Sequence, residues 1–274
     1  MLPIRDVEFD GIRRFVYQQT GIALGPEKQA LVVSRLNERL RVLKIRSFGA
    51  YLRRAAHDAA ERQMMIDAIT TNETHFFRER AHWDLLVERV IPRWREEQQQ
   101  GLRSRRLLVW SAGCSTGEEP FSIAMVLLSE LPASEGWSHE IVATDISQRV
   151  LAKASAATWR VDKQHEIPRP LLQSFMLRGV GSREGQMQAT AELRSIVTFA
   201  HSNLNDPRSY PAGAVDAIFC RNVLIYFDNA SRAAAVEHVT TCLAPGGYLF
   251  LGHSESLHSV AGMTPVGRSA FRKT

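Results

Sequence analysis

Apolar residues in the first quarter of the chain recur at the spacing of an amphipathic helix. In the clearest segment, between residues 26 and 46, the apolar positions are Val32, Leu36, Leu40 and Leu43. These positions fall on one face of a helix, so they predict a stripe that packs into a core. Pro26, after Gly25, suits the first turn of this helix. The pattern stays helical to about residue 70, and we predict a small all-helical domain over residues 1–70.

The pattern changes at residue 106, where short runs of apolar and β-branched residues begin. They are RLLVW (106–110), EIVATD (140–145), SIVTFA (195–200), AVDAIFC (214–220) and GYLFLG (247–252). Helical patterns separate several of these runs, most clearly over 118–131 and 229–243. Strands that alternate with helices form a mainly parallel sheet with helices on both faces. We therefore predict an α/β domain of doubly wound, Rossmann-like type over residues 71–274.

Two segments need a separate interpretation. The pattern over residues 71–94 predicts helix after a polar turn at 70–73, followed by an exposed charged connection at 95–106. Residues 158–194 are too irregular for one crossover helix. We predict that they form an inserted subdomain of a few antiparallel strands, with a turn at 179–181.

Composition excludes several classes of protein. The chain has 274 residues, of which 45% are hydrophobic and 23% charged, as in soluble globular proteins. Its longest apolar run, residues 123–128, is far shorter than the ~20 residues of a membrane span. The first ten residues carry acids where a signal peptide is basic and then apolar, and three scattered cysteines suit a reducing compartment. We expect a cytoplasmic protein with no membrane insertion.

Positive charge is concentrated in one segment. The net charge is +5, and residues 26–54 alone hold eight basic side chains and two acidic ones. Lys28, Arg35, Arg39 and Arg46 are spaced by seven, four and seven residues and so line one helix face. Such a face is either simply solvated or a docking surface for an acidic partner, a nucleic acid or an acidic protein helix. Aromatic residues for base stacking are not interleaved, which disfavours single-stranded nucleic acid.

The turn after the first predicted strand is a candidate cofactor site. It reads Ala112-Gly113-Cys114-Ser115-Thr116-Gly117-Glu118-Glu119-Pro120 and leads into a helix. Glycines at this place let the backbone approach a ligand, but the motif is neither GxGxxG nor a P-loop. Glu118 and Glu119 would repel a pyrophosphate at the helix start. A cofactor with positive charge and no phosphate, such as S-adenosylmethionine, fits better.

Asp145 ends the second predicted strand, where an acidic side chain can accept hydrogen bonds from two ribose hydroxyls. The alternative is a helix cap, which Ile146-Ser147 leaves open. With the glycine turn and its acids, Asp145 predicts an adenosine-binding domain. His253 and His258 are the tightest histidine pair, but five residues apart they do not share a helix face, and we expect no metal site.

Several motifs occur in one order along the chain. They are TNETHFFR (71–78), WSAGCSTGEEP (110–120), ATDIS (143–147), FCRNVLIYF (219–227), LAPGGY (243–248) and GHSES (252–256). With these motifs the chain resembles the CheR family of chemotaxis receptor methyltransferases. The resemblance covers nearly the whole chain and includes the basic N-terminal helices and the insertion. It implies S-adenosylmethionine-dependent methylation of glutamate side chains on the cytoplasmic helices of chemoreceptors, with S-adenosylhomocysteine as the product.

The resemblance also implies roles for individual residues. Arg78 and Tyr226 would lie near the transferred methyl group. The residues implied to contact the cofactor are Asn72, Thr74, Arg78, Glu118, Asp145, Asn203, Leu204, Arg221 and Asn222. The basic helix with Arg35, Arg39 and Arg46 would meet the acidic receptor, and the insertion is a second candidate contact. Cys114 is expected to be a packing residue and not a nucleophile.

The chemistry of such a transfer needs few groups. A glutamate side chain, with a reference pKa of about 4.3, is already a nucleophilic carboxylate at neutral pH, so no general base is required. Two rival functions remain. One is methylation of another substrate, although Arg221-Asn222-Val223-Leu224 stands where amino-directed nucleic acid methyltransferases have an Asn/Asp-Pro-Pro-aromatic motif. The other is a non-catalytic, receptor-binding adaptor.

Overall fold

The computed structural model describes residues 2–255 and 260–274, and its first helices form a separate domain. The helices are α1 (Asp6–Thr20), α2 (Gln29–Val42), α3 (Phe48–His57) and α4 (Ala59–Ile69), with a 3-10 turn at Pro26–Lys28 before α2. Ser47 caps α3 and Asp58 caps α4 through their side-chain oxygens. Val32, Leu36 and Leu40 are completely buried, as their spacing predicts. The predicted all-helical architecture of this part is confirmed.

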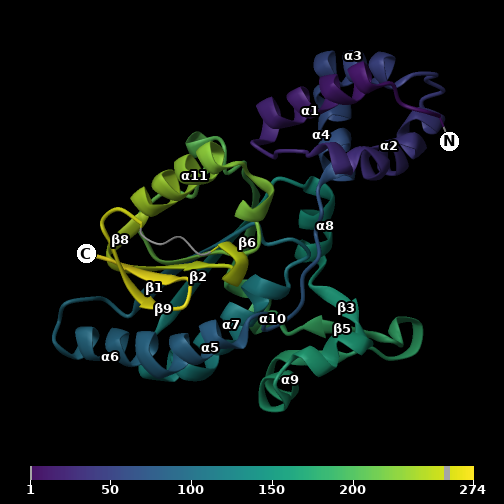
Figure 1. Ribbon diagram of the computed structural model, residues 1–274. Coiled ribbons are helices and arrows are strands. Elements are labelled where there is room, and N and C mark those ends of the chain that lie inside the picture. The colour runs from purple at the N-terminus through teal and green to yellow at the C-terminus, as the bar shows by residue number, and fades with distance from the viewer. Residues whose placement is uncertain (1, 256–259) are drawn as a thin grey trace.

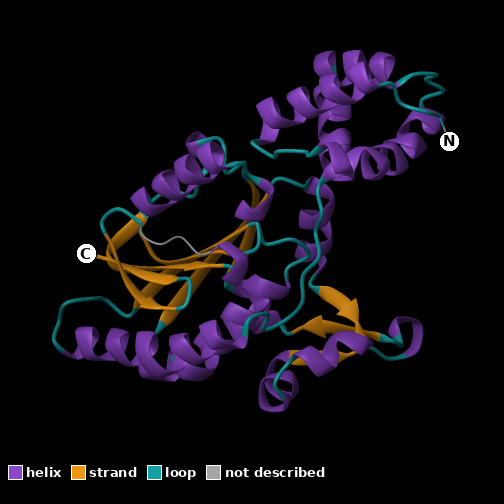
Figure 2. Cartoon of the chain, in the orientation of Figure 1, coloured by secondary structure: helices purple, strands orange, loops and turns teal. Residues whose placement is uncertain are grey.

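A seven-stranded sheet forms the centre of the second domain (Figure 2). Its strands are β1 (Arg106–Ala112), β2 (Ser138–Asp145), β6 (Val197–His201), β7 (Val215–Cys220), β8 (Leu243–Leu251), β9 (Met263–Gly267) and β10 (Ala270–Lys273). They lie in the order β6-β2-β1-β7-β8-β10-β9. All neighbours from β6 to β8 are parallel, and the last two strands add antiparallel pairs. The predicted mainly parallel sheet is confirmed, whereas the C-terminal hairpin β9–β10 was not expected.

Helices cover both faces of this sheet. The helices that cover or flank it are α5 (Arg80–Leu85), α6 (Ile91–Gln99), α7 (Glu118–Glu130), α8 (Gln148–Ala156), α10 (Ala191–Ser195) and α11 (Asn229–Thr241). A π-helical turn, Leu86–Val90, joins α5 to α6. Side chains of α5, α6 and α7 share one apolar core on one face, and α11 packs into a second core on the other face.

The inserted subdomain has its own small sheet, set apart from the central one (Figure 2). Its strands β3 (Thr158–Arg160), β5 (Gln186–Ala189) and β4 (Met176–Arg178) pair antiparallel in that order. A 3-10 turn at Val161–Glu166 and the helix α9 (Arg169–Phe175) lie between β3 and β4. We call residues 158–189 the insert. The prediction of antiparallel strands with a turn near residue 180 is confirmed.

One predicted helix is partly wrong. Residues 70–79, which we call the linker, are not helical, and helix begins only at Arg80. Phe77 and Glu79 have positive φ angles of 51° and 59°, which cannot continue a right-handed helix. The linker passes along the edge of the sheet and joins the two domains (Figure 1). Within residues 2–255 and 260–274, every helix is too short or too polar to traverse a bilayer.

Candidate active site

A cavity of about 340 Å³ opens at the carboxyl ends of β1, β2 and β7. The linker, the turn after β1 and the connection between α1 and α2 also contribute to its wall. Ligands bind at this edge of open α/β sheets because the loops there leave a crevice. The predicted site residues that line the cavity are Asn72, Thr74, Arg78, Asp145, Asn203, Leu204, Arg221, Asn222 and Tyr226. The structure thus brings together nine residues, seven of them from three separate motifs and two, Asn203 and Leu204, from the loop after β6.

Asp145 lies in the wall of the cavity at the end of β2. Its Oδ2 accepts a hydrogen bond from the amide of Ser115 at 2.9 Å, and its Oδ1 accepts one from the amide of Ser147 at 2.9 Å. Burial raises the pKa of the Asp145 carboxyl, while these backbone donors lower it. Ser147, and not Asp145, caps α8 through its side chain. Each Asp145 oxygen keeps a lone pair that can accept from a ligand hydroxyl.

The glycine turn brings the backbone close to the loop after β7. Gly113 has a φ of +86°, and a Cβ at this position would lie 2.3 Å from Cγ2 of Val223. Gly117, with a φ of +96°, precedes α7, and Ser115 between the two glycines also has a positive φ, of 49°. Only glycine meets both demands at position 113, the left-handed backbone and the lack of space.

Arg78 enters the cavity from the linker, where several contacts fix its backbone. Its carbonyl oxygen accepts hydrogen bonds from Trp83 Nε1, at 2.9 Å, and from Arg221 Nη2. Its own Nη1 donates to the carbonyl of Glu73 at 3.3 Å. Left-handed residues flank it on both sides, Phe77 and Glu79. These contacts therefore hold the main chain around Arg78 in its strained conformation.

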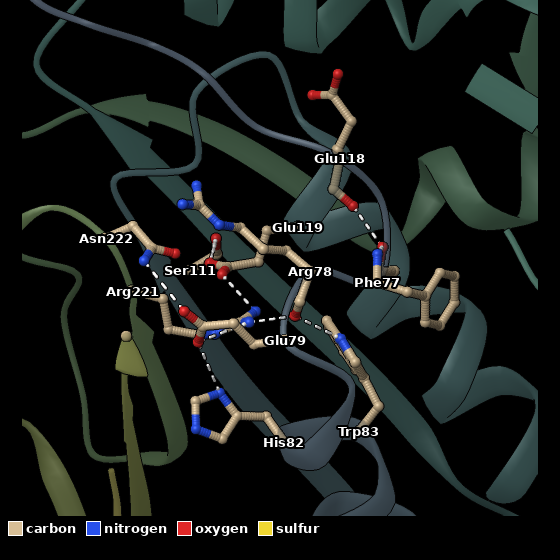
Figure 3. A network of polar contacts seen from close by, with 12 residues as sticks. Phe77, Arg78, Glu79, His82, Trp83, Ser111, Glu118, Glu119, Arg221 and Asn222 are labelled. Atoms are coloured by element: carbon tan, nitrogen blue, oxygen red, sulfur yellow. Dashed lines mark hydrogen bonds and ion pairs between the residues drawn. The ribbon is translucent and has the colours of Figure 1, made fainter. Parts of the chain in front are cut away.

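Arg221, at the end of β7, is the centre of a buried polar network (Figure 3). Its side chain is 1% exposed and pairs with Glu79 at 3.2 Å and with Glu119 at 3.1 Å. Glu119 also accepts from Ser111 Oγ at 2.7 Å, and Glu79 accepts from Asn222 Nδ2 at 3.1 Å. Arg221 thus connects the linker, β1, α7 and the loop after β7. These contacts indicate that its guanidinium supports the site's walls.

The two acidic residues of the glycine turn, Glu118 and Glu119, point their side chains to different places. Glu119 lines the cavity, and burial raises the pKa of its carboxyl. Glu118 lies outside the cavity and points away from the network around Arg221 (Figure 3). Its carboxylate pairs with Lys163 at 2.6 Å and accepts from Thr116 Oγ1 at 2.6 Å. Because adjacent residues of a helix face different directions, the sequence could not tell which of the two acidic side chains faces the cavity.

Tyr226 completes the wall on the side of the N-terminal domain. Its carbonyl oxygen accepts a hydrogen bond from the amide of Ala23 at 2.8 Å. Burial raises the pKa of its phenol, and the Arg78 charge lowers it. The phenol stays protonated at neutral pH, so Tyr226 can donate a hydrogen bond into the cavity.

The side-chain amide of Asn203, another predicted site residue, has a hydrogen-bond partner within the protein. Asn203 Nδ2 donates to the carbonyl of Gln19 in α1 at 2.7 Å, which fixes its amide at the cavity wall.

Glu79, His82 and His253 cluster closely enough to suggest a metal site, but Arg221 already supplies a cation to Glu79. His258, which the sequence analysis considered together with His253, lies outside the described residues.

Cys114 is buried, and burial raises the pKa of its thiol, which makes it a poor nucleophile.

The basic face of α2 is only partly available to a partner. Arg39 pairs with the buried Glu61 at 2.5 Å, and Tyr51 donates to the same carboxylate at 2.9 Å. Arg35 Nη1 donates to the carbonyl oxygen of Ile69, at 2.6 Å, and of Thr70, at 3.1 Å. Arg46 is exposed. Their shared helix face predicted four equivalent basic side chains, but long side chains can turn back to buried acceptors of their own domain.

Comparisons with known proteins agree with this architecture. The CheR methyltransferase SAM binding domain matches residues 72–269, and the CheR methyltransferase all-alpha domain matches residues 7–70. Chemotaxis protein methyltransferase 2 of Pseudomonas aeruginosa is 39% identical over 265 residues, which cover 96% of this chain and 92% of that protein. The chemotaxis protein methyltransferase of Salmonella typhimurium is 38% identical over 262 residues, covering 94% of this chain and 87% of its own.

Proposed function

Because the chain belongs to the CheR methyltransferase family, we propose that it methylates glutamate side chains on the cytoplasmic helices of chemoreceptors, with S-adenosylmethionine as the methyl donor. The observation that carries this proposal is that Arg78 and Tyr226 line the same cavity as Asp145 and Glu119. Two donors that suit a substrate carboxylate thus share one space with two acids that suit the cofactor. Such a substrate would place the enzyme in the cytoplasm.

The residues of the cavity suit this cofactor. Asp145 offers two oxygens to ribose hydroxyls, and Glu119 offers negative charge to a cationic group. We propose that Glu119 fills the role expected of Glu118. The remaining contacts with the cofactor would come from Asn72, Thr74, Asn203, Leu204 and Asn222. Arg221 would support the cavity walls behind these residues. When bound, S-adenosylmethionine supplies an electrophilic methyl group on a sulfonium.

The chain's own task is to position the glutamate. Its carboxylate is ionised at neutral pH and needs no base. Arg78 can bind one carboxylate oxygen and leave the other free, while Tyr226 donates a hydrogen bond that fixes the orientation of the group. Holding reactants in line contributes up to about 7–11 kcal/mol in model reactions. Removal of water from the reacting ions favours a step in which opposite charges disappear.

The receptor would dock beside the cavity mouth. Lys28 is exposed and lines the cavity, and Arg41, Lys44 and Arg46 are exposed farther along α2 and just after it. We assign docking to these side chains, with Arg35 and Arg39 acting inside the domain. Positive charge here suits receptor helices that are acidic around their methylation sites. The insert, with Leu177 54% exposed and Val180 80% exposed, is the second surface in this proposal.

Methyl transfer to a carboxylate has a diagnostic product. The protein is incubated with methyl-labelled S-adenosylmethionine and chemoreceptor-bearing membranes, and the labelled receptor is treated with mild alkali. A methyl ester releases volatile methanol, whereas a methylated nitrogen keeps its label. Label that resists alkali, or wild-type protein that binds cofactor and receptor without transfer, would contradict the proposal. Asp145→Asn should weaken cofactor binding at least tenfold, and Asp84→Asn, on the exposed side of α5, is its control.

A further inference from the structure

The insert contacts the linker at its base. We infer that Lys163 and Glu166, in the 3-10 turn of the insert, are positioning residues for methyl transfer, because they hold the linker in the shape that brings Arg78 to the cavity. This inference rests on the proposed function. It concerns two side chains that lie outside the cavity and touch neither of the groups expected to react.

Lys163 joins three parts of the molecule. Its Nζ donates to the carbonyl of Thr74 at 3.1 Å and pairs with Glu118 Oε1 at 2.6 Å. Glu118 begins α7 and is 1% exposed. A carboxylate so deeply buried is costly without a cationic partner, so Lys163 is not free to leave. The linker carbonyl at Thr74 is thereby tied to the helix that follows the glycine turn.

Glu166 holds the next part of the linker. Its Oε2 accepts a hydrogen bond from the amide of Phe76 at 2.8 Å. Phe76 is 2% exposed, and the linker has no regular secondary structure in which its amide could pair. Removing the acceptor leaves a buried N–H without a partner unless the linker moves. Arg78 is two residues farther on, so a shift at Phe76 displaces it.

Aromatic packing makes the same connection. Trp159 of β3 packs edge-on against Phe76, with ring centroids 5.0 Å apart, and against Phe121 of α7 at 5.2 Å. Its Nε1 donates to the carbonyl of Thr116 in the glycine turn at 3.2 Å. The base of the insert is therefore packed against both chain segments that approach the cavity from this side. Lys163 and Glu166 add directional, charged bonds to this packing.

The experiment uses the full chain and two pairs of variants. Lys163→Met and Glu166→Ala remove the bonds, while Lys153→Met and Glu184→Ala change exposed residues of the same types. Binding of S-adenosylhomocysteine is measured by calorimetry, hydrogen exchange follows the amides of residues 71–78, and kcat and KM come from methanol release. We expect at least tenfold lower kcat or cofactor affinity in the first pair, with faster linker exchange, and changes below twofold in the controls. Glu166→Gln, which keeps an acceptor oxygen, should recover most of the loss.

These measurements distinguish failure of the inference from failure of the proposed function. Cofactor affinity and kcat within twofold of wild type in both Lys163→Met and Glu166→Ala would overturn the inference, whatever happens to linker exchange. If Lys163→Met does not fold, the comparison of Glu166→Ala with Glu166→Gln decides alone. Failure of the proposed function is a different result, since wild-type protein would then form no alkali-labile ester. Cofactor affinity and hydrogen exchange need no receptor and test the inference in either case.

Discussion

The amide of Ala23 donates a hydrogen bond to the carbonyl oxygen of Tyr226 at 2.8 Å. Beside it, Ile22 and Phe227 form an isolated antiparallel bridge. Two residues about 200 positions apart in the chain are thus joined through their main chains. The connection between α1 and α2 therefore fixes the loop that carries the Tyr226 phenol, and the helical domain takes part in building the cavity.

Removing this main-chain bond should slow the reaction without emptying the cofactor site. In Ala23→Pro the donor is lost, and we expect turnover to fall about three- to tenfold, the equivalent of one ordinary hydrogen bond. Affinity for S-adenosylhomocysteine should stay within twofold, because the Asp145 side of the cavity is untouched. Ala23→Ser keeps the amide and serves as the control. Unchanged turnover in the proline variant would show that the bond does not position Tyr226.

Arg78 and Tyr226 should differ in how much turnover depends on them. Arg78→Ala removes the charged donor proposed to bind the substrate carboxylate, and we expect kcat to fall at least 100-fold. Tyr226→Phe removes one neutral hydroxyl, so a loss of about tenfold is expected. The neighbouring Arg80, which is exposed, supplies a control in Arg80→Ala. Steady-state methanol release measures all three, and wild-type rates in both active-site variants would exclude these residues from the chemistry.

The two arginines of α2 at positions 39 and 41 should behave oppositely in stability and docking. Arg39→Ala leaves Glu61, 5% exposed, without its cationic partner, and we expect a loss of about 3 kcal/mol in the free energy of unfolding. Arg41→Ala changes an exposed side chain and should cost less than about 0.5 kcal/mol. Arg41→Glu should instead raise the KM for the receptor. Urea denaturation and receptor titration separate the two effects, and equal stability losses would refute the assignment.

Stability should fall in mildly acidic solution because of His82. Burial lowers the pKa of its imidazole to about 4, below the value of 6.5 for an unperturbed histidine. Between these pH values the unfolded chain binds a proton that the folded protein does not. The stability that the neutral His82 contributes to the free energy of unfolding is thus fully present above pH 6.5. It is lost as the pH falls toward 4, by at most about 1.4 kcal/mol per pH unit.

A variant isolates this contribution from those of other titrating groups. His82 packs against Phe250 with ring centroids 5.6 Å apart, so His82→Phe preserves an aromatic ring in the space. The free energy of unfolding, measured by urea denaturation from pH 7 to pH 5, should depend less steeply on pH in the variant than in wild type. Identical slopes would mean that His82 titrates in the folded protein as it does in the unfolded chain.

The sequence predicted those features that depend on periodic burial. The stripe Val32, Leu36 and Leu40 and the short apolar runs were enough for the helical domain and the parallel sheet, since burial of one helix face or of a whole strand leaves a clear pattern. The hairpin β9–β10 was missed because its residues, MTPVG and AFRK, are mostly exposed or alternate weakly. The linker was mistaken for helix because its left-handed residues, Phe77 and Glu79, carry no glycine signal.

Nine of the predicted site residues line the cavity, but the sequence did not predict how the side chains are oriented. Asp145 and Arg78 could be placed because strand ends and motif order locate the main chain. Glu118 could not be distinguished from Glu119, since the difference depends on Lys163, 45 residues away in the insert. Glu79, which holds Arg221 and Asn222, was not singled out at all. Arg35 and Arg39 were assigned to the surface because spacing along a helix cannot show which long side chains fold back to internal partners.

Four non-glycine residues with left-handed backbone, Phe77, Glu79, Ser115 and Asn222, lie in or beside the walls of the cavity. Each such residue costs about 1 kcal/mol or more relative to glycine, and surrounding bonds must hold it in place. Laboratory evolution for heat resistance would therefore be drawn to these positions, where a glycine relieves strain. Enzymes selected in that way should survive heating yet lose the fixed geometry of Arg78 and Asn222. Stabilising substitutions are better sought in α1–α4, away from Tyr226 and the linker.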